Sequence, residues 1–193
     1  MRTFAFVLLA FLSSSVLAQA NVRVRGTITA LEGDVLSVKS RDGRDIKVQV
    51  APDVQVAVAK TIKLSDIKPG TYLGVTSVAG PDGRLVAKEV HTIPPQAPAG
   101  HMSWDLLPNS NMTNANLTST AQASGGNEIT LTYKDGSQKI LVTPETAVVT
   151  FVPGSRADLK PGETIFTIAR VEGDGKFATQ RVSVSKDGVK PPQ

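Results

Sequence analysis

The pentapeptide DIKPG, Asp66 to Gly70, returns almost unchanged as DLKPG, Asp158 to Gly162. In each occurrence the aspartate can cap a single helical turn, and the proline-glycine pair can end that turn and reverse the chain. The two pentapeptides therefore predict the same corner at two places in the chain. Such self-similarity indicates a duplicated domain.

Landmarks around the two pentapeptides keep the same order. Residues Leu36 to Gly43 align with Ile129 to Gly136, and both segments alternate apolar and polar residues before an Asp-Gly pair. After the loss of one residue the alignment continues through further matches: Pro52 with Pro144, and Asp82-Gly83 with Asp174-Gly175.

The dominant period within each copy is two residues, which is typical of a strand with one buried and one exposed face. The first strand shows it most clearly, in the series Val22, Val24, Gly26, Ile28 and Ala30. We expect strands near residues 22–31, 35–40, 44–50, 71–79 and 84–92, and again near 114–122, 128–133, 138–143, 163–171 and 176–184.

Five short strands joined by hairpins, with a helical turn between the third and the fourth, are typical of an OB-type barrel. Closure of the barrel would remove exposed strand edges. The prediction is an all-β protein with two OB-like small β-barrel modules in tandem after a cleaved signal peptide. The expected divisions are residues 1–20 as signal peptide, 21–93 as module 1, 94–113 as a Pro/Asn-rich linker, 114–186 as module 2 and 187–193 as a C-terminal tail.

The first 20 residues have the features of a bacterial secretory signal: Arg2, an apolar run from Phe4 to Leu12, and a small-residue ending at Ala18 to Ala20. The apolar run is shorter than the roughly 20 residues of a membrane-spanning helix, and no later segment is apolar enough to be one. The chain contains no cysteine, so we expect neither disulfides nor a lipid anchor on cysteine. The expected location is the periplasm or the medium.

The pattern resembles a family of small bacterial envelope domains of unknown function. The residues that carry the resemblance are Gly26 to Ile28, Val38 to Gly43, Pro52, Leu64 to Gly70 and Asp82 to Ala87. The second copy departs from the pattern, with Asn116-Leu117-Thr118 at the first strand. Because the matching residues are turn and core residues, the resemblance implies an OB-like fold and no catalytic residue.

Similar exported two-copy proteins, with a step like Met112 to Ala115 into the second copy, are sometimes labelled metal-transporter permeases. A permease needs several membrane-spanning helices, and this sequence offers none after its signal. The sequence therefore does not support that label.

Catalysis is not expected. A nucleophile needs an adjacent base, usually histidine, and an oriented third group. His91 and His101 are the only histidines, neither lies in a nucleophile motif, and we interpret both as surface residues. The aspartates of the turns serve the backbone. We expect no catalytic residue and no cofactor.

Metal binding is the alternative function. His91, His101, Met102 and Met112 lie in or beside the linker. Imidazole and thioether groups suit copper in an oxidising compartment. Methionines next to leucine and tryptophan are, however, more often packing residues.

Nucleic-acid binding and membrane spanning are not expected. After removal of the signal, 20 basic and 17 acidic residues remain, and they are scattered. Single-stranded nucleic acid is bound by aromatic side chains along a basic groove. The remaining aromatic residues fall mostly at expected core positions of strands: Tyr72, Trp104, Tyr133, Phe151, Phe166 and Phe177.

The linker contains the single tryptophan, Trp104, beside Leu106 and Leu107. These residues either pack into the seam between the modules or form an exposed anchor for a partner. The expected function is a non-enzymatic, exported binding or assembly accessory of the bacterial envelope, whose partner is an unknown envelope protein or small ligand.

Overall fold

The computed structural model describes residues 20–191, so the expected signal peptide lies outside it apart from Ala20. Within these residues the protein is all-β, as predicted, and its two helices are single 3₁₀ turns. The elements are β1 (Asn21–Glu32), β2 (Val35–Ser40), β3 (Asp45–Thr61), η1 (Leu64–Asp66), β4 (Tyr72–Ala79), β5 (Leu85–Thr92), β6 (Gly100–Ser103), β7 (Asn111–Ala123), β8 (Gly126–Tyr133), β9 (Gly136–Val142), β10 (Ala147–Pro153), η2 (Arg156–Asp158), β11 (Thr164–Val171) and β12 (Phe177–Val184).

All ten expected strands occur at or near their expected positions. The differences concern length and number. Strand β3 continues to Thr61, and the corresponding stretch of the second copy is divided into β9 and β10 by a turn at residues 143–146. Strand β6 lies inside the segment expected to be a linker, where it pairs with β7.

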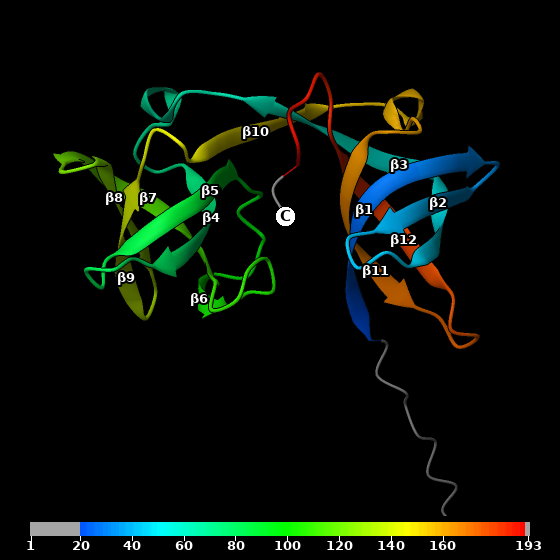
Figure 1. The fold of residues 1–193 in the computed structure, drawn as a ribbon, viewed down its shortest axis with the longest axis horizontal. Coiled ribbons are helices and arrows are strands. Elements are labelled where there is room, and N and C mark those ends of the chain that lie inside the picture. Colours follow the sequence, from blue (N-terminus) through cyan, green and yellow to red (C-terminus); the bar gives the residue numbers. More distant parts are fainter. Residues whose placement is uncertain (1–19, 192–193) are drawn as a thin grey trace, which may run out of the picture.

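The strands form two rings, which we call the first and the second lobe (Figure 1). The first lobe consists of β1, β2, the first part of β3, β12 and β11, and the pairing of β12 with β3 closes the ring. The second lobe consists of β4, β5, β9, β8 and β7. Its ring is closed by β5 and β9 over two residue pairs.

Each lobe takes strands from both copies, which corrects the expectation that each copy closes a barrel by itself. Strand β1 of the first copy pairs with β11 of the second, and β4 of the first copy pairs with β7 of the second. The last two strands of each copy have thus crossed to the other copy. The expectation failed because both possible partners present the same alternating pattern, and pairing order cannot be read from alternation alone.

The residue pairs of the two lobes correspond to one another. In the first lobe Phe177 pairs with Val48, and in the second Leu85 pairs with Ile140, with each member 92 positions from its counterpart. Bulges also recur, since the β1–β2 register shifts after Ile28 and the β7–β8 register shifts after Leu117.

The second half of β3 and β10 form a two-stranded antiparallel ribbon that joins the lobes along one side (Figure 1). In this ribbon Ala59 lies opposite Phe151, and these residues are themselves 92 positions apart. An approximate two-fold axis therefore passes between Ala59 and Phe151.

The DIKPG and DLKPG corners lie where the chain crosses to the other copy. Gly70 has a φ of 88° and donates its N–H to the Leu117 carbonyl (2.7 Å). Gly162 has a φ of 93° and donates to the Ile28 carbonyl (2.9 Å). Glycine adopts this left-handed backbone without steric cost. Each pentapeptide thus attaches the end of its turn to the first strand of the other copy.

Each lobe has its own apolar core, and both copies contribute to each. The first core is lined by Val24, Ile28, Leu36, Val38, Val48, Val50, Val56, Val58, Leu159, Ile165, Ala169, Val182 and Val184. The second is lined by Ile67, Leu73, Val75, Ala87, Val90, Ala115, Leu117, Ile129, Leu131, Ile140 and Val142. The first core combines strands from both ends of the described chain, whereas the second core is built from residues 67–142.

Candidate functional site

A cleft of about 720 Å³ lies between the two lobes. Pockets of roughly 300 to 1,000 Å³ are the usual size of small-molecule sites. Strands β1, β2 and β11 supply one side, β5 and β10 supply the other, and the linker and the C-terminal tail complete it. The lining residues are Gly26, Thr27, Thr29, Lys39, Ser40, Arg41, Glu89, Leu106, Ala147, Val149, Thr164, Lys190 and Pro191.

Glu89 is the acidic residue among those that line the cleft. It lies on β5 opposite Ala147 of β10, and only 8% of its surface is exposed. Its Oε1 accepts a hydrogen bond from the Thr76 hydroxyl (2.9 Å). Charged side chains are rarely buried to this extent in proteins without a specific role or partner, so Glu89 is the clearest chemical feature of the cleft.

The first-lobe side of the cleft carries cations and hydroxyl groups. Lys39 and Arg41 lie at the end of β2, and the Lys39 ammonium also contacts Asp45 (3.2 Å). The Thr164 hydroxyl is buried and has no hydrogen-bond partner within residues 20–191. A buried hydroxyl without a hydrogen-bond partner is uncommon.

The linker is attached to the first lobe through Asp105. Both oxygens of its carboxylate accept hydrogen bonds from the Arg25 guanidinium, at 2.9 and 2.7 Å. These hydrogen bonds, and secondarily the charges of Arg25 and Arg23, hold the pKa of Asp105 below its usual value against the opposing effect of burial. A bidentate pair of this kind fixes orientation as well as position.

Trp104 reinforces the same attachment. The Arg23 guanidinium lies 4.0 Å from the centre of the indole ring, and that of Arg25 lies 5.7 Å from it. Arg25 also lies 5.1 Å from the ring of Phe166 on β11. Cation–π contacts within about 6 Å are attractive. The linker therefore bridges from β7 of the second lobe to β1 of the first.

The three residues proposed as a partner anchor lie in different surroundings. Trp104 is half-buried against Arg23, Leu106 lines the cleft, and Leu107 is 39% exposed. The Ser110 hydroxyl stabilises the turn that contains these three residues. It donates to the carbonyl oxygens of Trp104 and Leu107 and accepts a hydrogen bond from the Leu107 N–H. Leu106 and Leu107 are thus neighbours in sequence that point to different environments.

The two histidines occupy unlike positions. His91 is buried, which corrects the interpretation of it as a surface residue, and burial lowers its pKa to about 4. Its ring lies over Gly74, and its Nδ1 has no hydrogen-bond partner among the described residues. His101 is partly exposed, and its Nδ1 lies 2.9 Å from the Thr113 hydroxyl. Because Thr113 is fully buried, that hydroxyl could not meet a substrate.

Three of the four candidate metal ligands share one face of the second lobe. Met102 lies opposite Met112 in the β6–β7 pair, and Met112 lies opposite Thr76 in the β4–β7 pair. Thr76 lies opposite Glu89 in the β4–β5 pair, and His91 is two residues after Glu89 on the same strand. Residues directly opposite each other, or two apart, share a face of a sheet. His101 faces the other side with Thr113. Among residues 20–191, no three His, Cys, Asp or Glu side chains are grouped to hold a metal ion.

Glu89 and the Arg25–Asp105 pair were not identified from the sequence. Glu89 follows Lys88 within an amphipathic strand, and two adjacent charged residues there suggest exposure to solvent. Asp105 and Arg25 lie 80 positions apart, so no local pattern connects them. The adjacent Trp104 was the available signal that the linker makes specific contacts.

Comparison of this chain with protein-family models, with curated proteins and with solved structures finds no match. Among residues 20–191, no helix has the length and apolar character needed to cross a bilayer.

Proposed function

We propose that the protein is an exported, non-enzymatic binding or assembly accessory of the bacterial envelope, and that its ligand site is the cleft between the lobes. The observation that carries this proposal is the buried Glu89 carboxylate on the wall of a 720 Å³ cleft. Apolar clefts with a few convergent polar groups are the usual form of a ligand site. The secretory features of residues 1–20 support export.

The fold fits a duplicated OB-like unit whose copies have exchanged their last two strands. The support comes from residue pairs and bulges that recur at constant sequence offsets in the two lobes. Two similar barrels side by side leave a cleft between them, and the linker and the C-terminal tail complete it. Sites are common at such boundaries between compact units.

Native mass spectrometry of the protein, purified without denaturation from the bacterial envelope, tests the ligand site. We expect a small molecule to co-purify with the wild type and to be lost from Leu106→Asp, which places a charge in the cleft. Leu107→Asp is the matched control, because Leu107 is exposed and does not line the cleft. Equal retention by both variants would place the ligand elsewhere, and absence of any co-purifying molecule would remove the proposal.

Copper handling is the second candidate, because His91, Met102 and Met112 share one face of the second lobe. At neutral pH the His91 ring is uncharged and able to bind a metal, since burial has lowered its pKa to about 4. Titration calorimetry with Cu(I) and Cu(II) tests this function. Micromolar or tighter binding that Met112→Leu abolishes would support it, whereas weaker binding would exclude it.

A further inference from the structure

A second cleft, which we call the apolar cleft, lies beside the second lobe and has a volume of about 650 Å³. Three parts of the chain contribute aliphatic side chains to it: the segment before the DIKPG corner with Ile62 and Leu64, the region around the turn at residues 143–146 with Val142 and Val148, and the C-terminal tail with Val189. The apolar cleft adjoins the cleft between the lobes, with which it shares Ala147, Val149 and Lys190.

The corresponding corner of the first lobe is occupied by an arginine side chain. Leu64 and Asn127 of the apolar cleft correspond to Arg156 and Asp34 of the first lobe. Arg156 donates hydrogen bonds to two backbone carbonyl oxygens and pairs with Asp34 (2.8 Å). Leu64 has no polar group with which to make such bonds. The second lobe therefore leaves open, and lined by apolar groups, a corner that the first lobe closes.

The threonine hydroxyls at the turn beside the apolar cleft are already hydrogen-bonded within the protein. The Thr146 hydroxyl donates to the Ala87 carbonyl oxygen (3.1 Å) and accepts from the Thr143 N–H (3.0 Å). The Thr143 hydroxyl lies 3.3 Å from that of Thr146. A ligand in this cleft would thus be held mainly by burial of apolar surface, which suits a hydrocarbon chain.

The two charged residues that line the apolar cleft are both cationic. Lys63 and Lys190 are exposed, and neither takes part in an ion pair within residues 20–191. The acidic residues of the neighbouring segments do not line it: Asp66, Glu89, Glu145 and Asp187. Charge complementarity therefore favours a ligand with an anionic end.

We propose that the apolar cleft binds a fatty acid, with the hydrocarbon chain against Leu64 and Val148 and the carboxylate at Lys63 and Lys190. This site goes beyond the proposed function, which concerns the cleft between the lobes. An uncharged hydrocarbon would leave the two lysines unused, and a small anion would leave the apolar lining unused. A single apolar chain with an anionic end uses both, and a cleft of 650 Å³ is in the usual size range for one small ligand.

Titration calorimetry of the mature protein with amphiphiles tests the chemical class. Octanoate, decanoate and dodecanoate differ by two methylene groups, and each step should tighten binding about tenfold through the added apolar surface. Decyltrimethylammonium carries a cation on a chain of similar length and should bind at least tenfold more weakly than decanoate. Absence of decanoate binding, or equal binding of the anion and the cation, would overturn the proposal.

A double variant closes the apolar cleft with residues that the protein already uses. Leu64→Arg combined with Asn127→Asp copies the corner of the first lobe into the second and leaves the net charge unchanged. It should weaken decanoate binding at least tenfold, because the arginine side chain would take the place of the hydrocarbon chain. Thermal melting shows whether the variant is folded. Undiminished affinity in the folded double variant would contradict the site.

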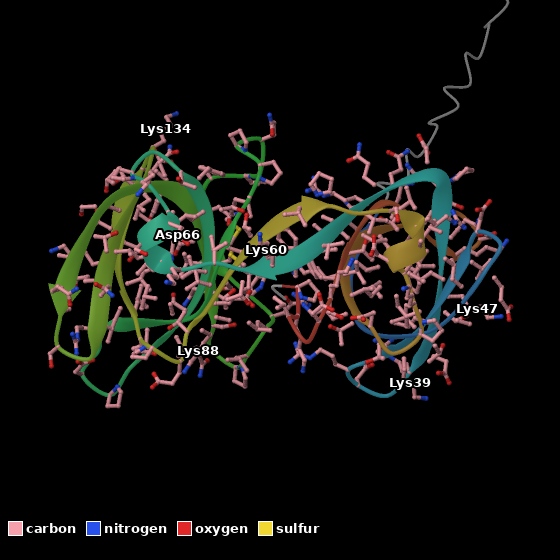
Figure 2. All side chains as sticks on the ribbon, turned by 90° about the horizontal axis from the view of Figure 1, so that it is seen from above. Lys39, Lys47, Lys60, Asp66, Lys88 and Lys134 are labelled. Atoms are coloured by element: carbon pink, nitrogen blue, oxygen red, sulfur yellow. The ribbon has the colours of Figure 1, made fainter. Side chains whose placement is uncertain are left out.

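Lys63→Gln and Lys190→Gln remain informative if the double variant fails to fold, because both lysines are exposed. Each should weaken decanoate binding about two- to fivefold. Lys134→Gln is the matched control, since Lys134 lies at the turn of the β8–β9 hairpin and the apolar cleft adjoins its other end, at Asn127 and Val142 (Figure 2). An equal loss in Lys134→Gln would reduce the effect to net charge and remove the assignment of the carboxylate.

Leu106→Asp separates this site from that of the proposed function. Leu106 lines the cleft between the lobes and not the apolar cleft, so this variant should bind decanoate as the wild type does. Loss of decanoate from Leu106→Asp, with full retention by the double variant, would place the fatty acid between the lobes and overturn this inference alone. Loss from the double variant with retention by Leu106→Asp supports it, whether or not the cleft between the lobes holds a ligand of its own.

Discussion

The two lobes share one pattern of strand pairing but close the same corner with different side chains. In the first lobe Arg156 donates hydrogen bonds to the carbonyl oxygens of Ala51 and Gly33 and pairs with Asp34 (2.8 Å). The corresponding residue of the second lobe is Leu64, which cannot make these bonds. Leu64 instead borders an apolar cleft of about 650 Å³.

The outer faces of the lobes differ in a similar way. The second lobe has Gly74 beneath the buried ring of His91, whereas the first lobe has Phe166 and Ser183 at the corresponding positions. Pairing depends on backbone hydrogen bonds and on the alternation of apolar residues, which both copies keep. Corner and face residues are under no such constraint, so the surfaces of the two lobes differ although their strand pairing is the same.

The largest expected effect comes from matched truncations in the two cores. Leu36→Ala in the first lobe and Ile129→Ala in the second each remove a fully buried side chain, and each should lower the free energy of unfolding by about 2–5 kcal/mol. Because each lobe contains strands of both copies, each variant should shift one common transition in urea, followed by circular dichroism. Two separate transitions would show that the lobes unfold independently.

A pH effect of about 3 kcal/mol is expected from His91. Burial lowers its pKa in the folded protein from 6.5 to about 4, so the unfolded chain binds the proton at higher pH than the folded one. Stability should therefore be full above pH 6.5 and fall progressively between pH 6.5 and 4. Urea denaturation across this range checks the slope.

His91→Ser introduces the residue of the corresponding position in the first lobe and should remove this pH dependence. A slope unchanged in His91→Ser would assign the effect to another group.

A methyl group is tolerated in one lobe and excluded from the other. Gly26 of β1 corresponds to Ala115 of β7, yet a Cβ at Gly26 would overlap the Lys39 carbonyl oxygen. Gly26→Ala should cost about 1–3 kcal/mol through the backbone shift that it forces. Ala115→Gly, the reverse change, should cost no more than about 1 kcal/mol. Thermal melting of both variants makes the comparison, and equal losses would contradict the structure.

A loss of about 1 kcal/mol is expected from Trp104→Ala, because the variant removes the contact of the indole with the Arg23 and Arg25 guanidinium groups. Differential scanning calorimetry measures the change. Leu107→Ala is the control, since Leu107 is more exposed. An unchanged melting temperature in Trp104→Ala would show that the linker does not stabilise the junction of the lobes.

The smallest effect is expected from exchanging the corner residues. Arg156→Leu gives the first lobe the residue of the second and should cost about 0.5–1 kcal/mol, because the pair with Asp34 is partly exposed. The loss should shrink at high salt. Urea denaturation at low and high salt tests this, and a salt-independent loss would mean that packing is the main contribution of Arg156.

The strand positions were predictable because alternation and Asp-Gly turns are local signals. The exchange of strands was not. Whether β4 returns to β1 or crosses to β7 depends on the path of β3, which runs on as one strand through Pro52 to Thr61. The third strand was expected to end near residue 50, and the ribbon that its continuation forms with β10 was therefore missed.

The candidate site was predicted only in part. Trp104, Leu106 and Leu107 were identified from the composition of the linker, and Leu106 lines the cleft. His91 was expected on the surface because the residues next to it in sequence give no sign that β10 covers it. The burial of Glu89 depends on the same long-range packing, because Glu89 lies opposite Ala147 of β10. No pattern in the neighbouring sequence signals that burial.

The pairing of β1 with β11 joins residues such as Asn21 and Arg170, near opposite ends of the described chain. Contacts so distant in sequence slow folding, because loop closure comes before the gain from the contact. The first barrel cannot close until the last strands have been synthesised, so a nascent chain would leave the ribosome with its earliest strands unsatisfied. Delayed closure of this kind would suit the export proposed above, because a chain must be unfolded to pass through a translocation pore.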